Sequence, residues 1–234
     1  MHLIVLLGEA LLNTPVTTVL FDLDGTLIDS LPDLAESGAA LLESYGLTPL
    51  APESVRAMIG DGARKLVGRL LIAAGDTGPI DRDEALERFL AFYTPRAALK
   101  TRLFPGVKAT LQTLVENGIA CAICTNKPAE AARLIVEKLG LSPLIDAIGG
   151  GDSFSVRKPD PGHVIETLRL MGRPVSGAAM IGDHRNDMLA ARDAGLPGIF
   201  AAWGYGDASM SRDATAIARR IEDVPPLLEK VTAL

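Results

Sequence analysis

The sequence predicts an α/β protein in which a parallel β-sheet is interrupted by one all-helical insertion. Short apolar, β-branched runs alternate with longer segments of helical periodicity along most of the chain, which is typical of parallel strands joined by helices. Between residues 30 and 102, helical segments follow one another without a convincing strand, and this stretch is longer than an ordinary crossover connection. We therefore predict a discontinuous core domain of residues 14–29 and 103–234, a helical domain of residues 30–102, and an N-terminal extension of residues 1–13.

The core domain is predicted to contain five strands and four helices. The strands are expected at residues 16–21, 119–124, 144–148, 178–181 and 198–201. The helices are expected at residues 105–117, 128–139, 161–171 and 186–194. A proline stands in the first turn of each of the first three helices, where its missing N–H is tolerated, and a glycine follows the end of all four.

The helical insertion is predicted to hold four amphipathic helices. Their apolar residues recur at helical spacing in residues 31–45, 52–59, 63–74 and 82–99. The two linkers to the core are expected near Asp29 and at residues 101–104.

The composition excludes several classes of function. The 234 residues are 48% hydrophobic but only 4% aromatic, so we expect a sizeable, mainly aliphatic core. A net charge of -6 argues against nonspecific binding to nucleic acid or to an anionic membrane surface. The apolar run at residues 3–7 is too short to span a membrane and is a poor signal peptide, so we expect a cytoplasmic protein.

The two cysteines, Cys121 and Cys124, are predicted to be structural. Both fall in a predicted strand, where residues three positions apart face opposite sides. No second pair of cysteines and no histidine cluster completes a zinc site. We therefore expect neither a redox pair nor a disulfide framework.

Polar side chains follow four of the predicted strands, at the edge where open parallel sheets bind their ligands. They are Asp22 and Asp24 after the first strand, Thr125 and Asn126 after the second, Lys158 after the third, and Asp183 and Asp187 after the fourth. Thr125 and Asn126 also precede a helix N-terminus, which suits an anion. Clustered carboxylates repel one another unless a cation lies between them, and Mg²⁺ prefers oxygen ligands of this kind. The sequence therefore predicts an anion site beside a Mg²⁺ site.

These four motifs, in this order, resemble those of the haloacid dehalogenase (HAD) superfamily over nearly the whole chain from Val16 onward. The resemblance implies a Rossmann-like core, and the insertion after the first motif resembles the helical cap domain of that superfamily. Further segments resemble bacterial phosphoglycolate phosphatases. They are residues 58–63, 103–107, 125–128, 149–152 and 158–161.

The resemblance implies hydrolysis of a phosphomonoester through an aspartyl-phosphate intermediate. Asp22 would be the nucleophile, and Asp24 would protonate the leaving alkoxide and then activate water. An acid at position 24 is what phosphatases and phosphomutases of the superfamily share. Thr125 and Asn126 would hold the phosphoryl oxygens, and Lys158 would neutralise charge beside them.

The resemblance also implies a set of metal ligands. Mg²⁺ would be bound by Asp22, by the backbone carbonyl of Asp24 and directly by Asp183. Asp187 would bind through water or orient its neighbours. We expect Thr26 to serve the structure of the loop.

The insertion is expected to determine the substrate specificity. Gly60 and Gly62 form a flexible loop, and Asp61 is expected to cap the helix that begins near Ala63. Arg64 and Lys65 follow in the first turn, where a cation would contact a substrate carboxylate; alternatively, they belong to a solvated basic face.

Two histidines are assigned no chemistry. We expect His184 to line the rim of the site. We expect His163 to lie on the surface.

Several functions fit the same motifs. 2-Phosphoglycolate is the leading substrate, but relatives with the same cap hydrolyse sugar phosphates or pyrophosphate, and a phosphomutase of the β-phosphoglucomutase type shares the nucleophile. A non-catalytic interaction protein would need a damaged site, and a receiver domain would lack the insertion. The partner we expect is a small-molecule phosphate ester, with no nucleic acid and no membrane, and the protein is expected to be a monomer or a homodimer.

Overall fold

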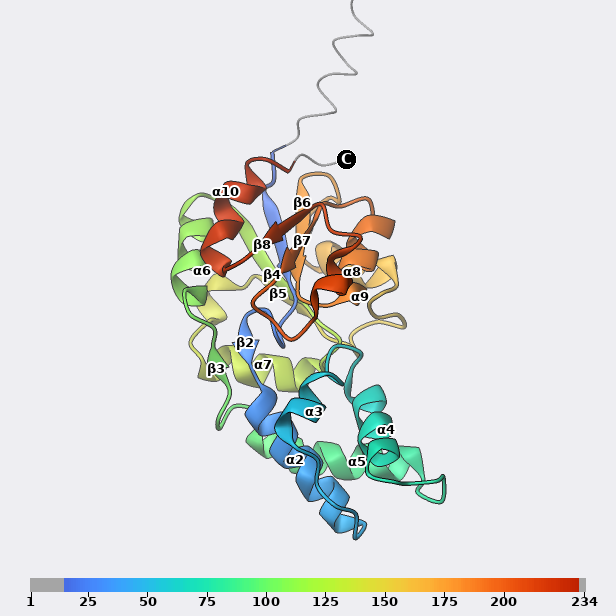
Figure 1. Cartoon of the computed structure of the whole chain (residues 1–234). Helices are drawn as coiled ribbons and strands as arrows, with labels where there is room; N and C mark the ends of the chain where they lie inside the picture. The colour runs from blue at the N-terminus through green and yellow to red at the C-terminus, as the bar shows by residue number, and fades with distance from the viewer. Residues whose placement is uncertain (1–14, 232–234) are drawn as a thin grey trace, which may run out of the picture.

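A six-stranded parallel sheet forms the centre of the protein in the computed structural model, which describes residues 15–231. The strand order is β5-β4-β1-β6-β7-β8 (Figure 1). The strands are β1 Thr18–Phe21, β4 Ala120–Cys124, β5 Ala147–Gly149, β6 Ala178–Gly182, β7 Gly198–Ala201 and β8 Ala216–Ala218. This topology confirms the predicted fold class. The predicted N-terminal extension lies outside the described residues.

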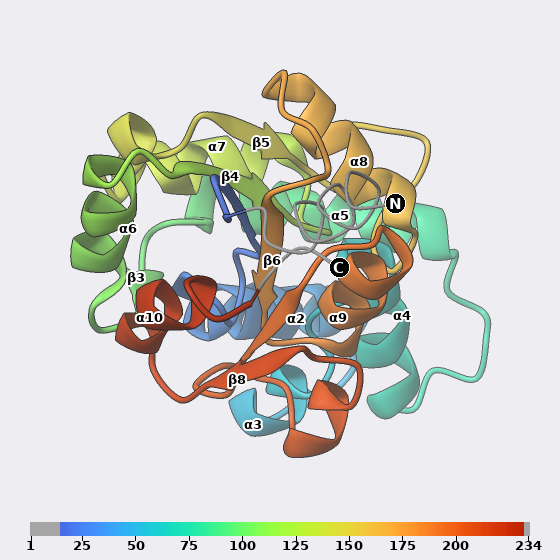
Figure 2. The ribbon, with the colours of Figure 1, turned by 90° about the horizontal axis from the view of Figure 1, so that it is seen from above.

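Helices cover both faces of this sheet (Figure 2). One face packs on α6 (Val107–Glu116), α7 (Ala129–Lys138) and α10 (Val224–Leu228), and the other on α8 (Pro161–Leu170) and α9 (Arg185–Asp193). Both cysteines are buried and free. Cys121 packs in the first layer and Cys124 in the second, which confirms that they face opposite sides.

Among the core elements whose boundaries differ from the prediction, two differ for a local structural reason. Gly106 has a left-handed φ of +81° and precedes α6, so Pro105 lies outside the helix rather than in its first turn. Residues 142–144 form a 3₁₀ turn, and β5 therefore begins only at Ala147. The prediction missed β8, a three-residue strand at the edge of the sheet.

Four helices of the insertion pack on one another beyond the carboxyl ends of the strands (Figure 1). They are α2 (Leu31–Ser44), α3 (Pro52–Arg56), α4 (Ala63–Ala73) and α5 (Arg82–Tyr93). The helix predicted to reach residue 99 ends at Tyr93 and continues only as a 3₁₀ turn. Pro95 lies in that turn, and a proline has no backbone N–H with which to continue the hydrogen bonding of an α-helix.

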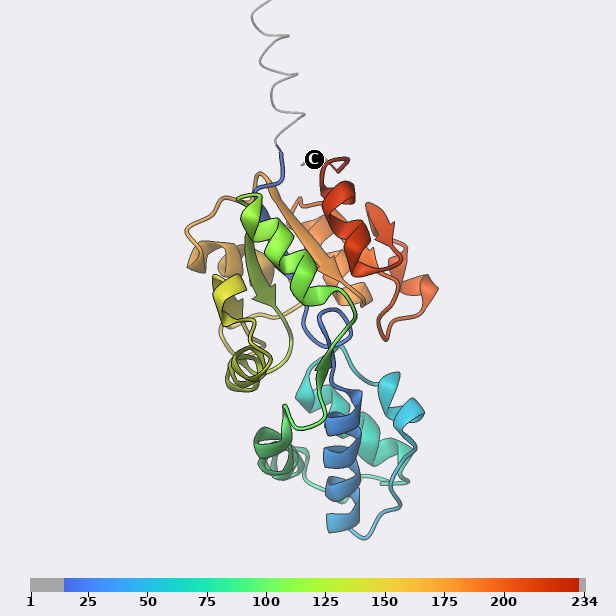
Figure 3. The same cartoon turned by 90° about the vertical axis from the view of Figure 1, so that its left-hand side faces the viewer.

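The two linkers pair with each other. The strands β2 (Ile28–Asp29) and β3 (Arg102–Leu103) form a short antiparallel ribbon between the sheet and the helices (Figure 3). The buried carboxylate of Asp33, on α2, accepts hydrogen bonds from the backbone of Lys100 and Thr101 and from the Thr101 hydroxyl. The two chain connections between the helical insertion and the core thus lie side by side. That residues 30–102 behave as a separate domain stays a prediction.

No helix between residues 15 and 231 has the length and apolar character needed to cross a membrane.

Candidate active site

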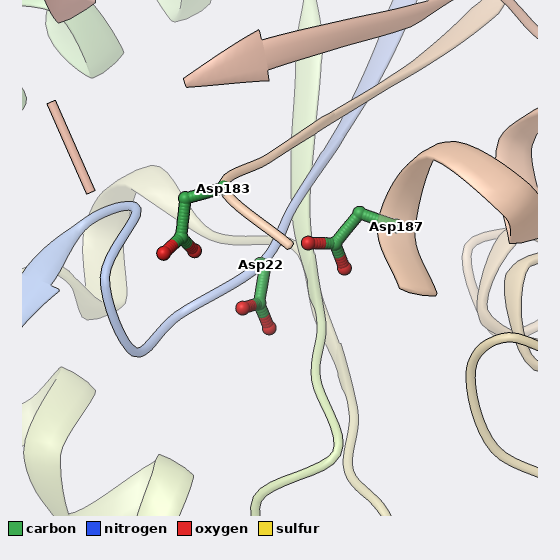
Figure 4. Close-up of side chains that lie close together, drawn as sticks. All are labelled: Asp22, Asp183 and Asp187. Atoms are coloured by element: carbon green, nitrogen blue, oxygen red, sulfur yellow. The ribbon is translucent and has the colours of Figure 1, made fainter. Parts of the chain in front are cut away.

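Three carboxylates meet at the carboxyl ends of β1 and β6 (Figure 4). Asp22 follows β1, Asp183 follows β6, and Asp187 lies in the first turn of α9. All three are buried, and one oxygen from each lies within 4.8 Å of the others. Burial first, and then the charges of Asp22 and Asp187, raise the pKa of Asp183 to about 8. The negative charge around Asp183 is therefore not fully compensated.

Neighbouring groups hold Asp183 in this cluster. Thr26 donates from its hydroxyl to one carboxylate oxygen at 3.0 Å, and the backbone N–H of Tyr205 donates to the other at 2.7 Å. The predicted structural role of Thr26 fits this contact. A Cβ on Gly25 would lie 2.3 Å from an Asp183 oxygen, so the turn after β1 leaves no space for a side chain there.

Lys158 is the cation of the cluster. Its Nζ donates to Asp22 at 2.9 Å and to Asp187 at 2.5 Å, and also to the carbonyl of Cys124. Burial by itself would lower the pKa of Lys158, but the charges of Asp187 and Asp22 outweigh burial and raise it. The side chain therefore stays an ammonium, and it orients the Asp22 carboxylate.

His163 is fully buried, so the expectation that it lies on the surface is wrong. It faces inward from α8, where its Nδ1 accepts the backbone N–H of Lys158 at 3.1 Å and its ring meets Phe154 edge to face. Burial and the Lys158 ammonium lower the pKa of His163 to about 4. A neutral imidazole thus fixes the loop that carries Lys158.

The side chain of Asp24 is not part of the carboxylate cluster. Its oxygens accept two hydrogen bonds of 2.8 Å from Lys127, and one of them also accepts the hydroxyl of Ser30. Lys127 is fully buried within a motif that the sequence singled out, but no role was predicted for it. Asp24 therefore faces the insertion rather than the other carboxylates.

Thr125 and Asn126 lie between β4 and α7, next to the cluster. The Asn126 amide donates to the carbonyl of Lys158 at 2.9 Å and to that of Gly60, in the insertion, at 3.1 Å. Its carbonyl oxygen is buried without a hydrogen-bond partner among the described residues. Thr125 and Asn126 both line a small pocket.

The pocket lies between the core and the insertion and has a volume of about 40 Å³, room for a few water molecules or a small molecule. The core supplies its polar wall, and the insertion supplies a mainly apolar one. The polar wall consists of Asp22, Asp24, Thr125, Asn126 and Lys127 with Pro128. The apolar wall includes Leu34, Ile59, Ala63, Leu66, Phe89, Leu90 and Tyr93.

Arg64 and Lys65 do not line this pocket. Arg64 pairs with Asp83 and Lys65 with Asp61, and both side chains are more than half exposed. The structure thus places both residues, which were predicted to contact a substrate carboxylate, outside the pocket.

Asp61 does not cap α4, contrary to the prediction, because Gly62 is the N-cap residue. Its carboxylate accepts instead from Arg69 and from the Asn186 amide of the core at 2.9 Å. His184 caps α9 through its Nδ1 and lies against Gly60. These residues form a contact between the insertion and the core.

Comparisons with known proteins agree with this geometry. The haloacid dehalogenase-like hydrolase family matches residues 19–201. The chain is 40% identical over 191 residues to the phosphoglycolate phosphatase of Caulobacter vibrioides, covering 80% of each chain. It is 36% identical over 225 residues to that of Neisseria meningitidis, covering 92% of this chain and 94% of the relative.

A solved structure shares the whole fold. A predicted phosphoglycolate phosphatase from Haemophilus somnus superposes with a TM-score of 0.84 at 28% identity, covering 91% of this chain and 97% of the other. The family match, these relatives and the cluster at the ends of β1 and β6 lead to one conclusion. The chain belongs to the haloacid dehalogenase-like hydrolases and is a phosphatase of that family.

Proposed function

We propose that this phosphatase uses Mg²⁺, forms a phosphoryl-aspartate on Asp22 and hydrolyses 2-phosphoglycolate. The observation that carries the proposal is the convergence of Asp22, Asp183 and Asp187 within 4.8 Å, with Lys158 bonded to two of them. The substrate is inferred from the relatives named phosphoglycolate phosphatase and from the small size of the pocket.

The carboxylate cluster fits a hard divalent cation. Its donors are all oxygens, and burial, followed by the charges of Asp22 and Asp187, raises the pKa of Asp183. Asp22, Asp183 and Asp187 would hold the ion, with the backbone carbonyl of Asp24. Mg²⁺ at this position would allow an anionic carboxylate to approach an anionic phosphate.

In the proposed reaction, Asp22 attacks phosphorus while Lys158 keeps its carboxylate in place. Asp24 donates a proton to the ester oxygen, which leaves as an alcohol. Thr125 holds the phosphoryl oxygens together with the backbone N–H of Asn126, since both protons of the Asn126 side-chain amide are already donated. Asp24 then takes a proton from the water that cleaves the phosphoryl-aspartate, which releases phosphate and restores Asp22.

The test is release of inorganic phosphate from 2-phosphoglycolate, compared with sugar phosphates and pyrophosphate, with Mg²⁺ or with EDTA. We expect 2-phosphoglycolate to have the highest kcat/KM and EDTA to abolish turnover. A phosphomutase would instead move phosphate within a sugar without releasing it.

The nucleophile is tested separately with Asp22→Asn, which keeps the shape of the side chain. We expect loss of turnover, and we expect rapidly quenched wild-type protein to carry one phosphoryl group on the peptide that contains Asp22. Near-normal turnover by Asp22→Asn would refute the mechanism, whatever the substrate.

A further inference from the structure

The pocket has one cation on its walls. Of the lining residues in the described part of the chain, Lys127 alone carries a positive charge. The insertion contributes apolar side chains and one phenol there, since Arg64 and Lys65 are turned outward. Within this pocket, Lys127 is therefore the cation that a negative charge on the leaving group of a substrate would contact.

Lys127 is placed to accept a second anionic partner. Its ammonium has three protons, and the two oxygens of Asp24 account for its hydrogen bonds to described residues. It lies 4.8 Å from the ring centroid of Tyr93. Its ion pair with the Asp24 carboxylate keeps the side chain an ammonium.

Tyr93 supplies an independent observation. The residue is 2% exposed, lines the pocket, and stacks on Phe89 with 5.7 Å between ring centroids. Its buried hydroxyl has no hydrogen-bond partner among the described residues. Burying a hydroxyl without a hydrogen-bond partner costs folding free energy. A role in binding a ligand would explain why such a group is present.

We propose that Lys127 of the core and Tyr93 of the insertion form a subsite that binds a carboxylate on the leaving group of the substrate. This proposal rests on the proposed function, because Asp24 must touch the ester oxygen. Lys127 lies 2.8 Å from Asp24, and two hydrogen bonds in series span about 5–6 Å. In 2-phosphoglycolate one CH₂ group separates the ester oxygen from the carboxylate, which therefore falls within reach of the ammonium.

The experiment compares 2-phosphoglycolate with its carboxamide analogue, which has the same shape without the charge. The measured quantity is the ratio of the two kcat/KM values, so that any general effect on Asp24 cancels. We expect Lys127→Met to lower the ratio roughly 100-fold and Tyr93→Phe roughly 10-fold, as for charged and neutral hydrogen bonds. Lys127→Arg should keep part of the preference.

The variants also separate binding from folding. Tyr93→Phe removes only an unpartnered hydroxyl, so it should fold even if Lys127→Met does not. Lys100→Met, which removes an exposed cation paired with Glu36, is the control and should leave the ratio unchanged.

Equal losses on both substrates in Lys127→Met and Tyr93→Phe would overturn the subsite. So would a drop in the ratio of similar size in Arg64→Ala or Lys65→Ala. If the wild-type enzyme showed no preference for 2-phosphoglycolate over the carboxamide, the proposed substrate would be refuted, and so would the proposed subsite.

Discussion

His163 positions Lys158 without taking part in the proposed chemistry. Its Nδ1 must be unprotonated to accept the Lys158 N–H, and the nearby ammonium opposes a second positive charge. Phe154 and the second helical layer leave the ring no route to solvent. The imidazole therefore has to stay neutral for the loop to keep its shape.

This requirement predicts a pH-dependent stability. Folding lowers the pKa of His163 from 6.5 to about 4, so the unfolded chain binds a proton in this interval that the folded chain does not. The contribution is complete above pH 6.5 and is lost as the pH falls toward 4, with a total on the order of 3 kcal/mol. Urea unfolding between pH 7 and pH 4 measures it.

The control is His163→Asn, whose side-chain oxygen can still accept the Lys158 N–H but cannot titrate. The carboxylates that titrate in this range are the same in both proteins. The difference between the two proteins in the pH dependence of the unfolding free energy therefore isolates the contribution of His163. Parallel curves for wild type and variant would show that the ring does not carry this effect.

At the scale of elements, the first turn of α2 is capped by the core. Ser30 precedes α2 but makes no side-chain cap. The hydroxyl of Tyr205, in the loop after β7, accepts the backbone N–H groups of Ser30 at 2.7 Å and Leu31 at 3.0 Å and donates to Asp29. Since the Tyr205 N–H holds Asp183, one residue links the carboxylate cluster to the start of the insertion.

We predict that Tyr205→Phe costs about 1–2 kcal/mol, because it leaves the Ser30 N–H without an acceptor. Urea unfolding gives the loss, and amide hydrogen exchange should be faster in the first turn of α2. Tyr45→Phe removes a hydroxyl without a partner in the described structure and should be neutral. A Tyr205→Phe protein as stable as Tyr45→Phe would contradict the capping role.

Sequence patterns predicted the elements that are long or bounded by clear signals. The strand at residues 198–201 has the expected bounds, and α8 begins at Pro161 as expected. The ribbon of β2 and β3 was missed because two residues per strand show no periodicity. The predicted helix ends at residues 59 and 99 were too late, because a periodic pattern does not mark where a helix ends.

Some residues of the candidate site could also be predicted from the sequence, and others could not. Residues such as Asp22 and Asp183 could be predicted because strand ends fix where they lie. Lys127, Tyr93 and His163 could not, because their roles depend on which way a side chain turns after the insertion has packed on the core. That Arg64 lies outside the pocket could not be predicted for the same reason.

At the scale of the whole molecule, Gly60 lies where the insertion packs against His184, the N-cap residue of α9. Its φ is +117°, and a Cβ there would lie 2.6 Å from the His184 ring. We predict that Gly60→Ala pushes the two parts apart and lowers kcat/KM tenfold or more, an effect of at least about 1.4 kcal/mol. Steady-state phosphate release measures it.

Gly75→Ala is the matched control. Gly75 also lies in the insertion and has a φ of +94°, but a Cβ there would meet nothing within 4 Å. Both variants carry backbone strain, and only one carries the clash. If both lost activity equally, strain rather than the contact with His184 would be responsible.

We also predict that Mg²⁺ stabilises the whole fold. An ion bound only by the folded state, at 100 times its Kd, contributes about 2.7 kcal/mol, which raises Tm by roughly 5–10 °C for a chain of this size. Calorimetry with Mg²⁺ and with EDTA measures the shift. It should vanish in Asp183→Asn, and a shift of full size in that variant would place the ion elsewhere.

Because β2 and β3 bring both ends of the helical insertion together, we expect that the insertion can be exchanged as a unit. Asp29 and Arg102 are register partners, so the chain departs from the core and returns to it one strand spacing away, as in a hairpin. A foreign helical segment spliced between these positions would meet the same two ends. Such a chimera would keep the carboxylate cluster of the recipient. The part of the proposed subsite that Tyr93 supplies would come from the donor, so specificity for the leaving group should change.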